Sequence, residues 1–209
     1  MKIVLASTSL RRKEILNLLG LPFEVVAPMY EEETLDDLSP YEEVVRFSKE
    51  KAKSVARRFP DSLIISGDTL IEFQGMKIGK PFSLAQAKQT LAGLRDATHD
   101  ILTGVALLNT KDQHFETAVE LVRVKMKNYT DAEIDRYVAE DQPLDKAGAY
   151  ALQGLGRTLI ENLEGDYLAA VGLPLKAVAR LLLHHGVQPK QDVETIYREK
   201  NFLNWRSYL

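Results

Sequence analysis

Short apolar runs alternate along this chain with segments whose apolar residues recur at helical spacing. The runs at 2–6, 23–26, 63–65 and 159–160 predict buried strands, and the longer stretches 99–108 and 115–126 predict two strands joined by a polar turn. Helical spacing follows residues 9, 39, 83, 130 and 174. Since strands and helices alternate without a low-complexity linker or an internal repeat, we expect one α/β unit.

Residues that favour helix starts precede most of the predicted helices. The segments 39–42, 83–86 and 130–133 each match a capping box, in which a Ser or Thr hydroxyl and a Glu or Gln side chain bond free N–H groups of the first turn. Ser9 is the expected N-cap of the first helix, and Gly20 can end it. The pattern therefore fixes several helix boundaries in advance.

Arg11 and Arg12 fall in the first turn of the first predicted helix. The helix dipole disfavours positive charge there by roughly 0.3–1 kcal/mol, whereas free N–H groups at a helix start attract phosphate. A bound anion would offset the cost, so the segment predicts a phosphate site. The alternative is a pair of solvated arginines on the helix surface.

Three further charged residues stand in constrained places. Asp68 interrupts a predicted core strand, between the apolar runs 63–65 and 70–71, where a carboxylate is costly unless it is hydrogen-bonded, paired with a cation or bound to a metal. Lys51 falls at the edge of the apolar face of the helix that starts at residue 40, and Lys80 lies between a glycine and a proline. The alternatives are a structural acid that caps a loop and an ordinary solvated lysine.

Composition narrows the class of ligand. The chain has 209 residues with a formal net charge of −3, so it lacks the broad cationic surface of a nucleic-acid-binding protein, and we expect a small anionic ligand instead. It contains no cysteine, which excludes disulfides and thiolate chemistry and fits a cytoplasmic location. No apolar stretch approaches the roughly 20 residues of a membrane span. We therefore expect neither nucleic acid nor a membrane as a partner.

The common phosphate and hydrolase motifs are absent. There is no P-loop, no G-x-G-x-x-G turn and no G-x-S-x-G elbow, which leaves hydrolysis by metal-activated water open. One carboxylate from the acidic run 31–33 could join Asp68 in holding Mg²⁺ or Mn²⁺. The basic residues available to neutralise a polyphosphate are Arg11, Arg12, Lys51 and Lys80. Taken alone, the acidic run is also typical of a solvated loop.

Several short motifs occur together in one order. Residues 5–12 read LASTSLRR, 50–52 read EKA, 67–69 read GDT, 79–81 read GKP, 145–150 read DKAGAY, 153–154 read QG and 171–174 read VGLP. From residue 2 to about residue 186, this order resembles the Maf-like nucleotide pyrophosphatase family. Each motif is short, and the resemblance depends on their occurring together.

The resemblance implies a fold and a reaction. The implied fold is α/β, with a central mixed, twisted sheet flanked by helices and a cleft between two lobes. The implied reaction is hydrolysis of nucleoside triphosphates between the α and β phosphates, giving monophosphate and pyrophosphate with a divalent metal. The arginine pair, GDT, and KAGAY with QG resemble the branch that acts on dTTP and UTP, with modified pyrimidine nucleotides as further candidates. The implied biological role is house-cleaning of nucleotides or a function linked to septum formation.

The resemblance also assigns roles to residues. Asp68 matches the catalytic acid, as general base or metal-bound carboxylate, and Glu31 matches a second metal-handling position. The matched substrate-binding positions are Ser7, Arg11, Arg12, Lys51, Thr69, Lys80 and Gln153. Among these, Arg12, Thr69 and Gln153 match positions tied to base choice. The chain departs from the family pattern at Leu10, Arg95, Asp96 and Asp166, and none of these removes a matched catalytic group.

We expect two parts along the chain. Residues 1–187 form the pyrophosphatase domain, and residues 188–209 form a helical tail whose aromatic side chains dock on the body or on a partner subunit. A homodimer is compatible with this expectation. The alternative to an enzyme is a nucleotide-binding regulator of growth or division that uses the same pocket without turnover. A mere binder has little need of a costly acid at Asp68, which favours the enzyme.

Overall fold

The computed structural model describes residues 1–31, 33, 37–141 and 143–208. Within these residues seven strands form one sheet, in the order β2-β1-β3-β5-β6-β7 with β4 paired to β3 off this path. Strand β1 (Lys2–Ala6) is parallel to the edge strand β2 (Glu24–Val26) and to β3 (Ser62–Phe73), and all other pairs are antiparallel. The remaining strands are β4 (Met76–Ile78), β5 (Thr98–Asn109), β6 (His114–Met126) and β7 (Ile160–Glu164).

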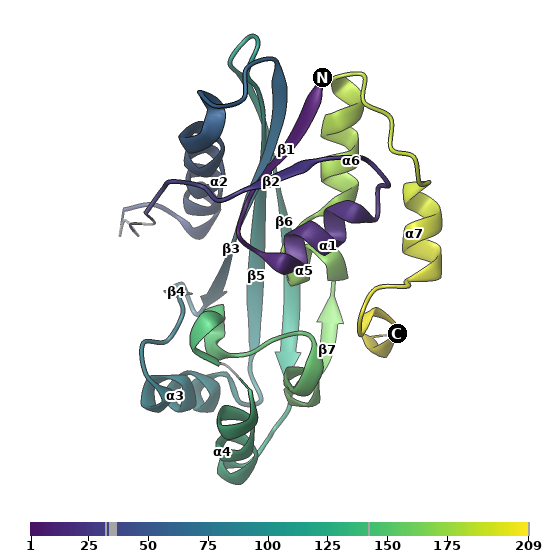
Figure 1. Cartoon of the computed structure of the whole chain (residues 1–209). Helices are drawn as coiled ribbons and strands as arrows, with labels where there is room; N and C mark the ends of the chain where they lie inside the picture. Colours follow the sequence, from purple (N-terminus) through teal and green to yellow (C-terminus); the bar gives the residue numbers. More distant parts are fainter. Residues whose placement is uncertain (32, 34–36, 142, 209) are drawn as a thin grey trace.

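Helices cover both faces of this sheet (Figure 1). One face carries α2 (Pro40–Ala56), and the other carries α1 (Leu10–Asn17), α5 (Tyr167–Val171) and α6 (Leu175–His184). At one end of the sheet lie α3 (Leu84–Leu94) and α4 (Asp131–Glu140), and α7 (Val193–Glu199) packs outside α6. The predicted mixed sheet flanked by helices is thus confirmed.

Alternating side chains of β1 feed two separate apolar cores. Val4 belongs to the core on the α2 face, together with Val55, and its neighbour Leu5 belongs to the core on the α1 face, together with Ile15. Successive residues of a strand point to opposite faces, which explains why β1 reads as a continuous apolar run. Burial of each such side chain contributes about 1.5–3 kcal/mol to folding.

The predicted capping boxes form with one exception. Ser39 and Thr130 each accept a hydrogen bond from the third residue of the following helix, and the Glu at that position reaches back to the capping N–H. Ser83 also accepts from Gln86 N, but the Gln86 carboxamide accepts from Phe82 N at 2.7 Å instead of from Ser83 N. The third box is therefore half formed, because the side chain of Gln86 reaches one residue further back.

One local expectation was wrong, and one short helix was not expected. The sequence predicts that Asp68 interrupts a strand, whereas β3 runs without a break from Ser62 to Phe73 because it pairs with β5 on both sides of this residue. The sequence gives no signal for α5, a helix of five residues capped by Asp166, whose side chain accepts from Leu168 N.

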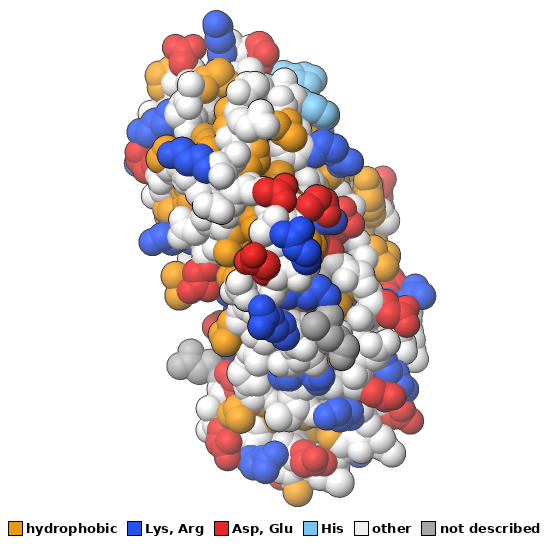
Figure 2. All heavy atoms as spheres, turned by 90° about the vertical axis from the view of Figure 1, so that its right-hand side faces the viewer, with side chains coloured by type: hydrophobic (Ala, Val, Ile, Leu, Met, Phe, Trp, Pro, Cys, Tyr) orange, Lys and Arg blue, Asp and Glu red, His pale blue; other side chains and the backbone are white. Residues whose placement is uncertain are grey.

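The face that carries α7 shows acidic and basic side chains intermixed, with apolar ones scattered between them (Figure 2). None of the helices in the described part of the chain combines the length and the apolarity that crossing a bilayer requires.

Candidate active site

A cavity of about 710 Å³ opens beyond the carboxyl end of β1. Here β1 lies between its parallel neighbours β2 and β3. Helix α1, which follows β1, and helix α2, which precedes β3, lie on opposite faces of the sheet (Figure 1). Loops that leave in opposite directions open a crevice at such a switch point, which is where α/β proteins bind ligands. The walls come from the loop after β1, the middle of β3, the loop after β4 and the segment 145–153.

The loop between β1 and α1 is held by its own serines. Ser7 N donates to Val26 O at 3.0 Å, and Ser7 Oγ accepts from Ser9 N at 3.1 Å. Ser9 Oγ accepts from Arg12 N at 3.3 Å, which confirms Ser9 as the N-cap. The first turn of α1 contains no acidic residue, so the unfavourable effect of the helix dipole on Arg11 and Arg12 is not offset within the helix.

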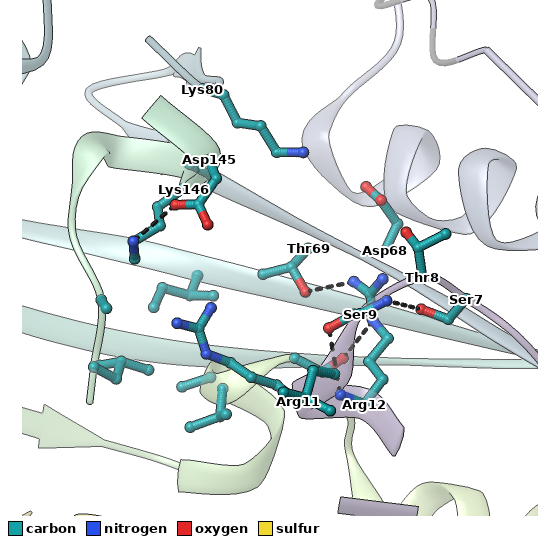
Figure 3. Close-up of a pocket in the computed structure, with 18 of the residues that line it drawn as sticks. Ser7, Thr8, Ser9, Arg11, Arg12, Asp68, Thr69, Lys80, Asp145 and Lys146 are labelled. Carbon is teal, nitrogen blue, oxygen red and sulfur yellow. Dashed lines mark hydrogen bonds and ion pairs between the residues drawn. The ribbon is translucent and has the colours of Figure 1, made fainter. Parts of the chain in front are cut away.

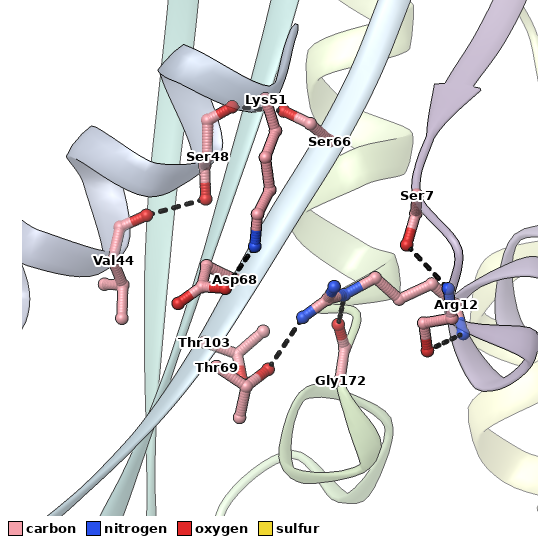
Figure 4. Close-up of polar contacts among 11 residues, drawn as sticks. Ser7, Arg12, Val44, Ser48, Lys51, Ser66, Asp68, Thr69, Thr103 and Gly172 are labelled. Carbon is pink, nitrogen blue, oxygen red and sulfur yellow. Dashed lines mark hydrogen bonds and ion pairs between the residues drawn. The ribbon is translucent and has the colours of Figure 1, made fainter. Parts of the chain in front are cut away.

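Asp68 lies on the α2 face of β3 and pairs with Lys51 (Figure 4). The Lys51 Nζ to Asp68 Oδ1 distance is 2.6 Å, and each side chain is 8% exposed. Asp68 stands opposite Gly104 of β5, where a Cβ would lie 2.8 Å from Val44 O on α2. The missing side chain at Gly104 therefore lets α2 approach closely enough for Lys51 to reach the carboxylate.

Two buried serines fix α2 against the sheet next to this pair. Ser66 Oγ of β3 donates to Ser48 O of α2 at 2.5 Å, and Ser48 Oγ donates to Val44 O at 2.7 Å (Figure 4). Ser66 and Asp68 are two residues apart on one strand and so face the same helix. These bonds hold the turn of α2 that carries Lys51.

Arg12 is held by hydrogen bonds to two other parts of the chain. Its Nε donates to Gly172 O at 2.9 Å, and its NH2 donates to Thr69 Oγ1 at 3.2 Å (Figure 4). Gly172 adopts a φ of +134°, a region that L side chains rarely occupy, and so presents its carbonyl oxygen in the turn after α5. Thr69 in turn contacts Thr103 Oγ1 at 3.1 Å on the neighbouring strand. Arg12 thus ties the loop after β1 to β3 and to the turn before α6.

Arg11 and Lys80 are the two cations without a protein counter-ion in the described part of the site. Arg11 Nε donates to Gln153 Oε1 at 3.3 Å, and neither Arg11 nor Lys80 pairs with a carboxylate of the described residues. Lys80 extends from its loop toward the side of the cavity that holds Asp68 (Figure 3). Two uncompensated cations that line one cavity indicate an anionic ligand.

The overall charge of the lining supports the same conclusion. Among the described residues, the lining contains the acids Asp68 and Asp145 and five cations, namely Arg11, Arg12, Lys51, Lys80 and Lys146. Lys146 is ion-paired with Asp145 at 2.7 Å and with Asp141 at 3.3 Å. A local excess of positive charge in a chain of net charge −3 is typical of a site for a small polyanion.

The structure brings most of the predicted site residues together. The cavity is lined by Asp68 and by all seven predicted substrate-binding residues, namely Ser7, Arg11, Arg12, Lys51, Thr69, Lys80 and Gln153. Glu31 is exposed and is not among the described lining residues, although its neighbour Tyr30 is. Glu32, the next acid of the run, lies outside the described residues.

Sequence reasoning gave no role to a buried pair behind the cavity wall. His99 Nε2 lies 2.7 Å from the hydroxyl of Tyr150, which lines the cavity, and His99 Nδ1 is buried without a hydrogen-bond partner in the described structure. Burial lowers the pKa of His99 to about 4 and raises the pKa of Tyr150 well above its usual value. The pair therefore stays neutral near pH 7. The signal in the sequence that could have indicated this pair is the polar residue His99 at the start of a predicted strand.

Fold and site together define a class, that of α/β proteins with a cavity at a sheet switch point that is lined by an excess of cations and by the carboxylate of Asp68. Residues 2–185 match the family described as Maf-like protein, and the chain belongs to that family. The resemblance noted in the sequence is thereby confirmed.

Curated relatives agree with this assignment. The chain is 44% identical over 184 residues to a dTTP/UTP pyrophosphatase of Halalkalibacterium halodurans, which covers 88% of this chain and 96% of that protein. It is 42% identical to the protein of that name from Dictyoglomus turgidum and 40% identical to the one from Bacillus anthracis, over 88% and 87% of this chain and 96% and 94% of theirs. Among solved structures, a nucleoside-triphosphatase (dITP/XTP pyrophosphatase) from Mycobacterium abscessus aligns over 89% of this chain and 95% of its own, at 16% identity and a TM-score of 0.44.

Proposed function

We propose that this protein is a nucleoside triphosphate pyrophosphatase that hydrolyses dTTP and UTP to the monophosphate and pyrophosphate. The observation that carries the proposal is the pair of uncompensated cations, Arg11 and Lys80, in one cavity with the Lys51–Asp68 pair. The names of relatives at 40–44% identity support the choice of dTTP and UTP.

The triphosphate is proposed to bind between the start of α1 and the loop that carries Lys80. The first N–H groups of α1 and the terminal nitrogens of Arg11 supply donors from one side, and Lys80 supplies positive charge from the other. Ser7 shapes the loop at this helix start through its bond with Ser9 N. In this arrangement the charge that develops on the leaving pyrophosphate meets fixed cations.

The proposed chemistry is displacement at the α-phosphorus. A water oxygen forms a bond to the α-phosphorus. At the same time the bond between the α-phosphorus and the oxygen that bridges to the β-phosphorus breaks, and pyrophosphate leaves with the electron pair. Asp68 has two candidate roles, as the base that accepts the proton of the water or as a carboxylate ligand to a metal. In either role Lys51 orients the carboxylate through the 2.6 Å pair.

The residues present suit a divalent cation that enters with the substrate. Asp68 supplies one carboxylate in the cavity, and the described residues contain no cluster of three or more acidic, His or Cys side chains able to hold an ion alone. Mg²⁺ in phosphate sites is commonly held by one or two carboxylates together with substrate phosphates and water. When bound, such an ion would polarise the phosphates and lower the pKa of a bound water. We propose Asp68 as its ligand, with Glu31 as the second candidate.

The base is proposed to bind near Gln153. Its carboxamide offers both a donor and an acceptor, which matches the N–H and carbonyl groups on the edge of uracil and thymine. Arg12 and Thr69 are proposed to support this side of the pocket, where they are bonded to each other at 3.2 Å.

The direct test measures pyrophosphate release from a panel of nucleoside triphosphates with Mg²⁺ or Mn²⁺. We expect turnover with dTTP and UTP and a loss of at least about a hundredfold in kcat for Asp68→Asn, since the neutral amide can neither accept a proton nor bind a metal well. Asp100→Asn is the control, because Asp100 pairs with Arg123 at the surface of β5. Absence of pyrophosphate release from every nucleotide would contradict the proposal, and full activity of Asp68→Asn would contradict the role of Asp68.

A further inference from the structure

The chain after α7 turns back and contacts the loop that carries Gln153. Leu203 O accepts a hydrogen bond from Gln153 Nε2 at 3.3 Å, and Asn204 Oδ1 accepts from Gly154 N at 3.2 Å. These bonds connect positions 50 residues apart in the sequence. The loop at the cavity thus rests on residues 203–208, which we call the C-terminal clamp.

The clamp makes two more contacts with the same loop. Tyr208 Oη donates to Leu152 O at 2.6 Å, and Leu152 itself lines the cavity. Arg157 donates through Nε and NH2 to Ser207 O, at 3.2 and 2.6 Å, and lies over the ring of Tyr208 at 4.3 Å. The segment 152–157 is therefore bonded along its length to the clamp.

Aromatic packing keeps the clamp in place. Trp205 is 5% exposed, stacks on Tyr167 with ring centroids 5.8 Å apart, and meets the edge of Tyr197 at 5.0 Å. Tyr167 also donates its hydroxyl to Leu203 O, the same oxygen that accepts from Gln153. Aromatic pairs of this kind contribute beyond their buried area, so the clamp is an ordered part of the body.

These contacts fix which way the carboxamide of Gln153 points. Its nitrogen donates to Leu203 O, and its oxygen accepts from Arg11 Nε at 3.3 Å. Each end of the amide therefore has a partner that only that end can serve. A base that pairs with this amide meets a donor and an acceptor in a fixed order.

The clamp lies outside the part of the chain that matches the family, which ends at residue 185. Asp166, one of the positions where the sequence departs from the family pattern, accepts from Tyr197 Oη at 2.6 Å and so connects α5 to α7, just before the clamp. The clamp, which lies outside the matched region, thus contacts Gln153, a residue of the proposed base-binding site.

We propose that the C-terminal clamp is a positioning element that sets the base preference of the enzyme by holding the carboxamide of Gln153. This inference rests on the proposed function. The triphosphate and Asp68 do not contact the clamp in this arrangement, so weakening the clamp affects recognition of the base more than the chemical step.

The test uses the double variant Asn204→Gly, Tyr208→Phe. Glycine keeps the left-handed conformation of Asn204, whose φ is +60°, while both substitutions remove hydrogen bonds to the loop and leave the aromatic packing in place. We expect KM for dTTP and UTP to rise about three- to tenfold, the usual range for loss of one or two hydrogen bonds, with kcat within about twofold of the wild type. The preference for UTP over CTP in kcat/KM should fall by a similar factor.

Two matched variants complete the experiment. Tyr197→Phe removes a hydroxyl bond of α7, which precedes the clamp, and this bond does not reach Gln153, so we expect the variant to leave the preference unchanged. Asn204→Asp, combined with wild-type Tyr208, retains an acceptor for Gly154 N and should keep most of the preference. Trp205 is the only tryptophan of the chain, so its fluorescence reports directly whether the clamp stays docked in each variant.

Unchanged base preference in the double variant, with Trp205 still docked, would overturn the inference. An equal loss of preference in Tyr197→Phe would also overturn it, because the effect would then be general destabilisation. If wild-type protein hydrolyses no nucleotide, the proposed function itself fails, which is distinct from an active wild type whose variants keep its preference.

Discussion

The carboxylate of Asp68 is buried against the ammonium group of Lys51, and this pairing links stability to function. Lys51 Nζ lies 2.6 Å from Asp68 Oδ1, and both side chains are 8% exposed. Removing one partner of a buried pair leaves an uncompensated charge, which costs about 3–5 kcal/mol, whereas removing both charges costs much less.

Lys51→Met is therefore expected to lower the free energy of unfolding by about 3 kcal/mol. Adding Asp68→Asn should recover a large part of that loss without restoring activity. Urea unfolding of the two single variants and the double variant measures the coupling energy. Additive effects of the two substitutions would contradict the pairing.

The burial of His99 leads to a second prediction, which concerns the pH dependence of the free energy of unfolding. Its pKa in the folded protein is about 4, against an ordinary value of 6.5, because burial disfavours the charged imidazole. Between these values the unfolded chain binds a proton that the folded chain does not, so the free energy of unfolding falls as pH falls. We expect His99 to contribute a loss of about 2 kcal/mol between pH 7.5 and pH 4.5.

The check compares urea unfolding of wild type, His99→Gln and His114→Gln across this pH range. His114 is exposed, so its variant should retain the wild-type pH dependence, whereas His99→Gln should lose that component. The same pH dependence in all three proteins would show that His99 is not buried in the neutral form.

Among the elements, the packing of α2 on β5 depends on Gly104. A Cβ at Gly104 would lie 2.8 Å from Val44 O and 3.1 Å from Ser48 Oγ, so α2 would have to move away from the sheet. That movement would separate Lys51 from Asp68. The close approach is thus a requirement of the site as well as of the packing.

Gly104→Ala is accordingly expected to lower stability by about 1–3 kcal/mol and to reduce kcat. Gly93→Ala is the matched control, because Gly93 lies in α3 and a Cβ there meets no atom within 4 Å. In a helix this change should raise stability by up to about 1 kcal/mol and leave kcat unchanged. Thermal unfolding and pyrophosphate release measure both effects, and equal behaviour of the two variants would contradict the steric argument.

Element boundaries were predictable where a local signal decides them. Ser9, Ser39 and Thr130 cap helices as their side-chain chemistry predicts, since each bond is made within one turn. The continuity of β3 through Asp68 was not predictable, because it depends on pairing with a strand more than 30 residues further along the chain. The short helix α5 likewise depends on packing, since all but one of its five residues are buried.

At the scale of the whole molecule, the topology explains why distant motifs form one site. The chain leaves β1 for α1 on one face and reaches β3 through α2 on the other, which brings Arg11, Lys51 and Asp68 to the cavity beyond the carboxyl end of β1. The sequence indicated these residues by type and spacing. It could not indicate that Lys51 neutralises Asp68 while Arg11 and Lys80 keep no counter-ion among the described residues, because those differences are set by tertiary distances.

The C-terminal segment shows the same limit. Its aromatic residues predicted docking, and Trp205 is indeed buried on the body of this chain. The contact between Leu203 O and Gln153 involves a backbone oxygen, so the pattern of side chains along the sequence could not predict it. Only the folded arrangement connects this segment to the cavity.

The central claim is that Asp68 and the surrounding cations direct water to the α-phosphorus of a bound pyrimidine triphosphate. The most direct test is hydrolysis of UTP in water enriched in oxygen-18, followed by mass spectrometry of both products. We predict that the heavy oxygen appears in the uridine monophosphate and not in the pyrophosphate. Label in the pyrophosphate, or release of single phosphates in place of pyrophosphate, would contradict the account.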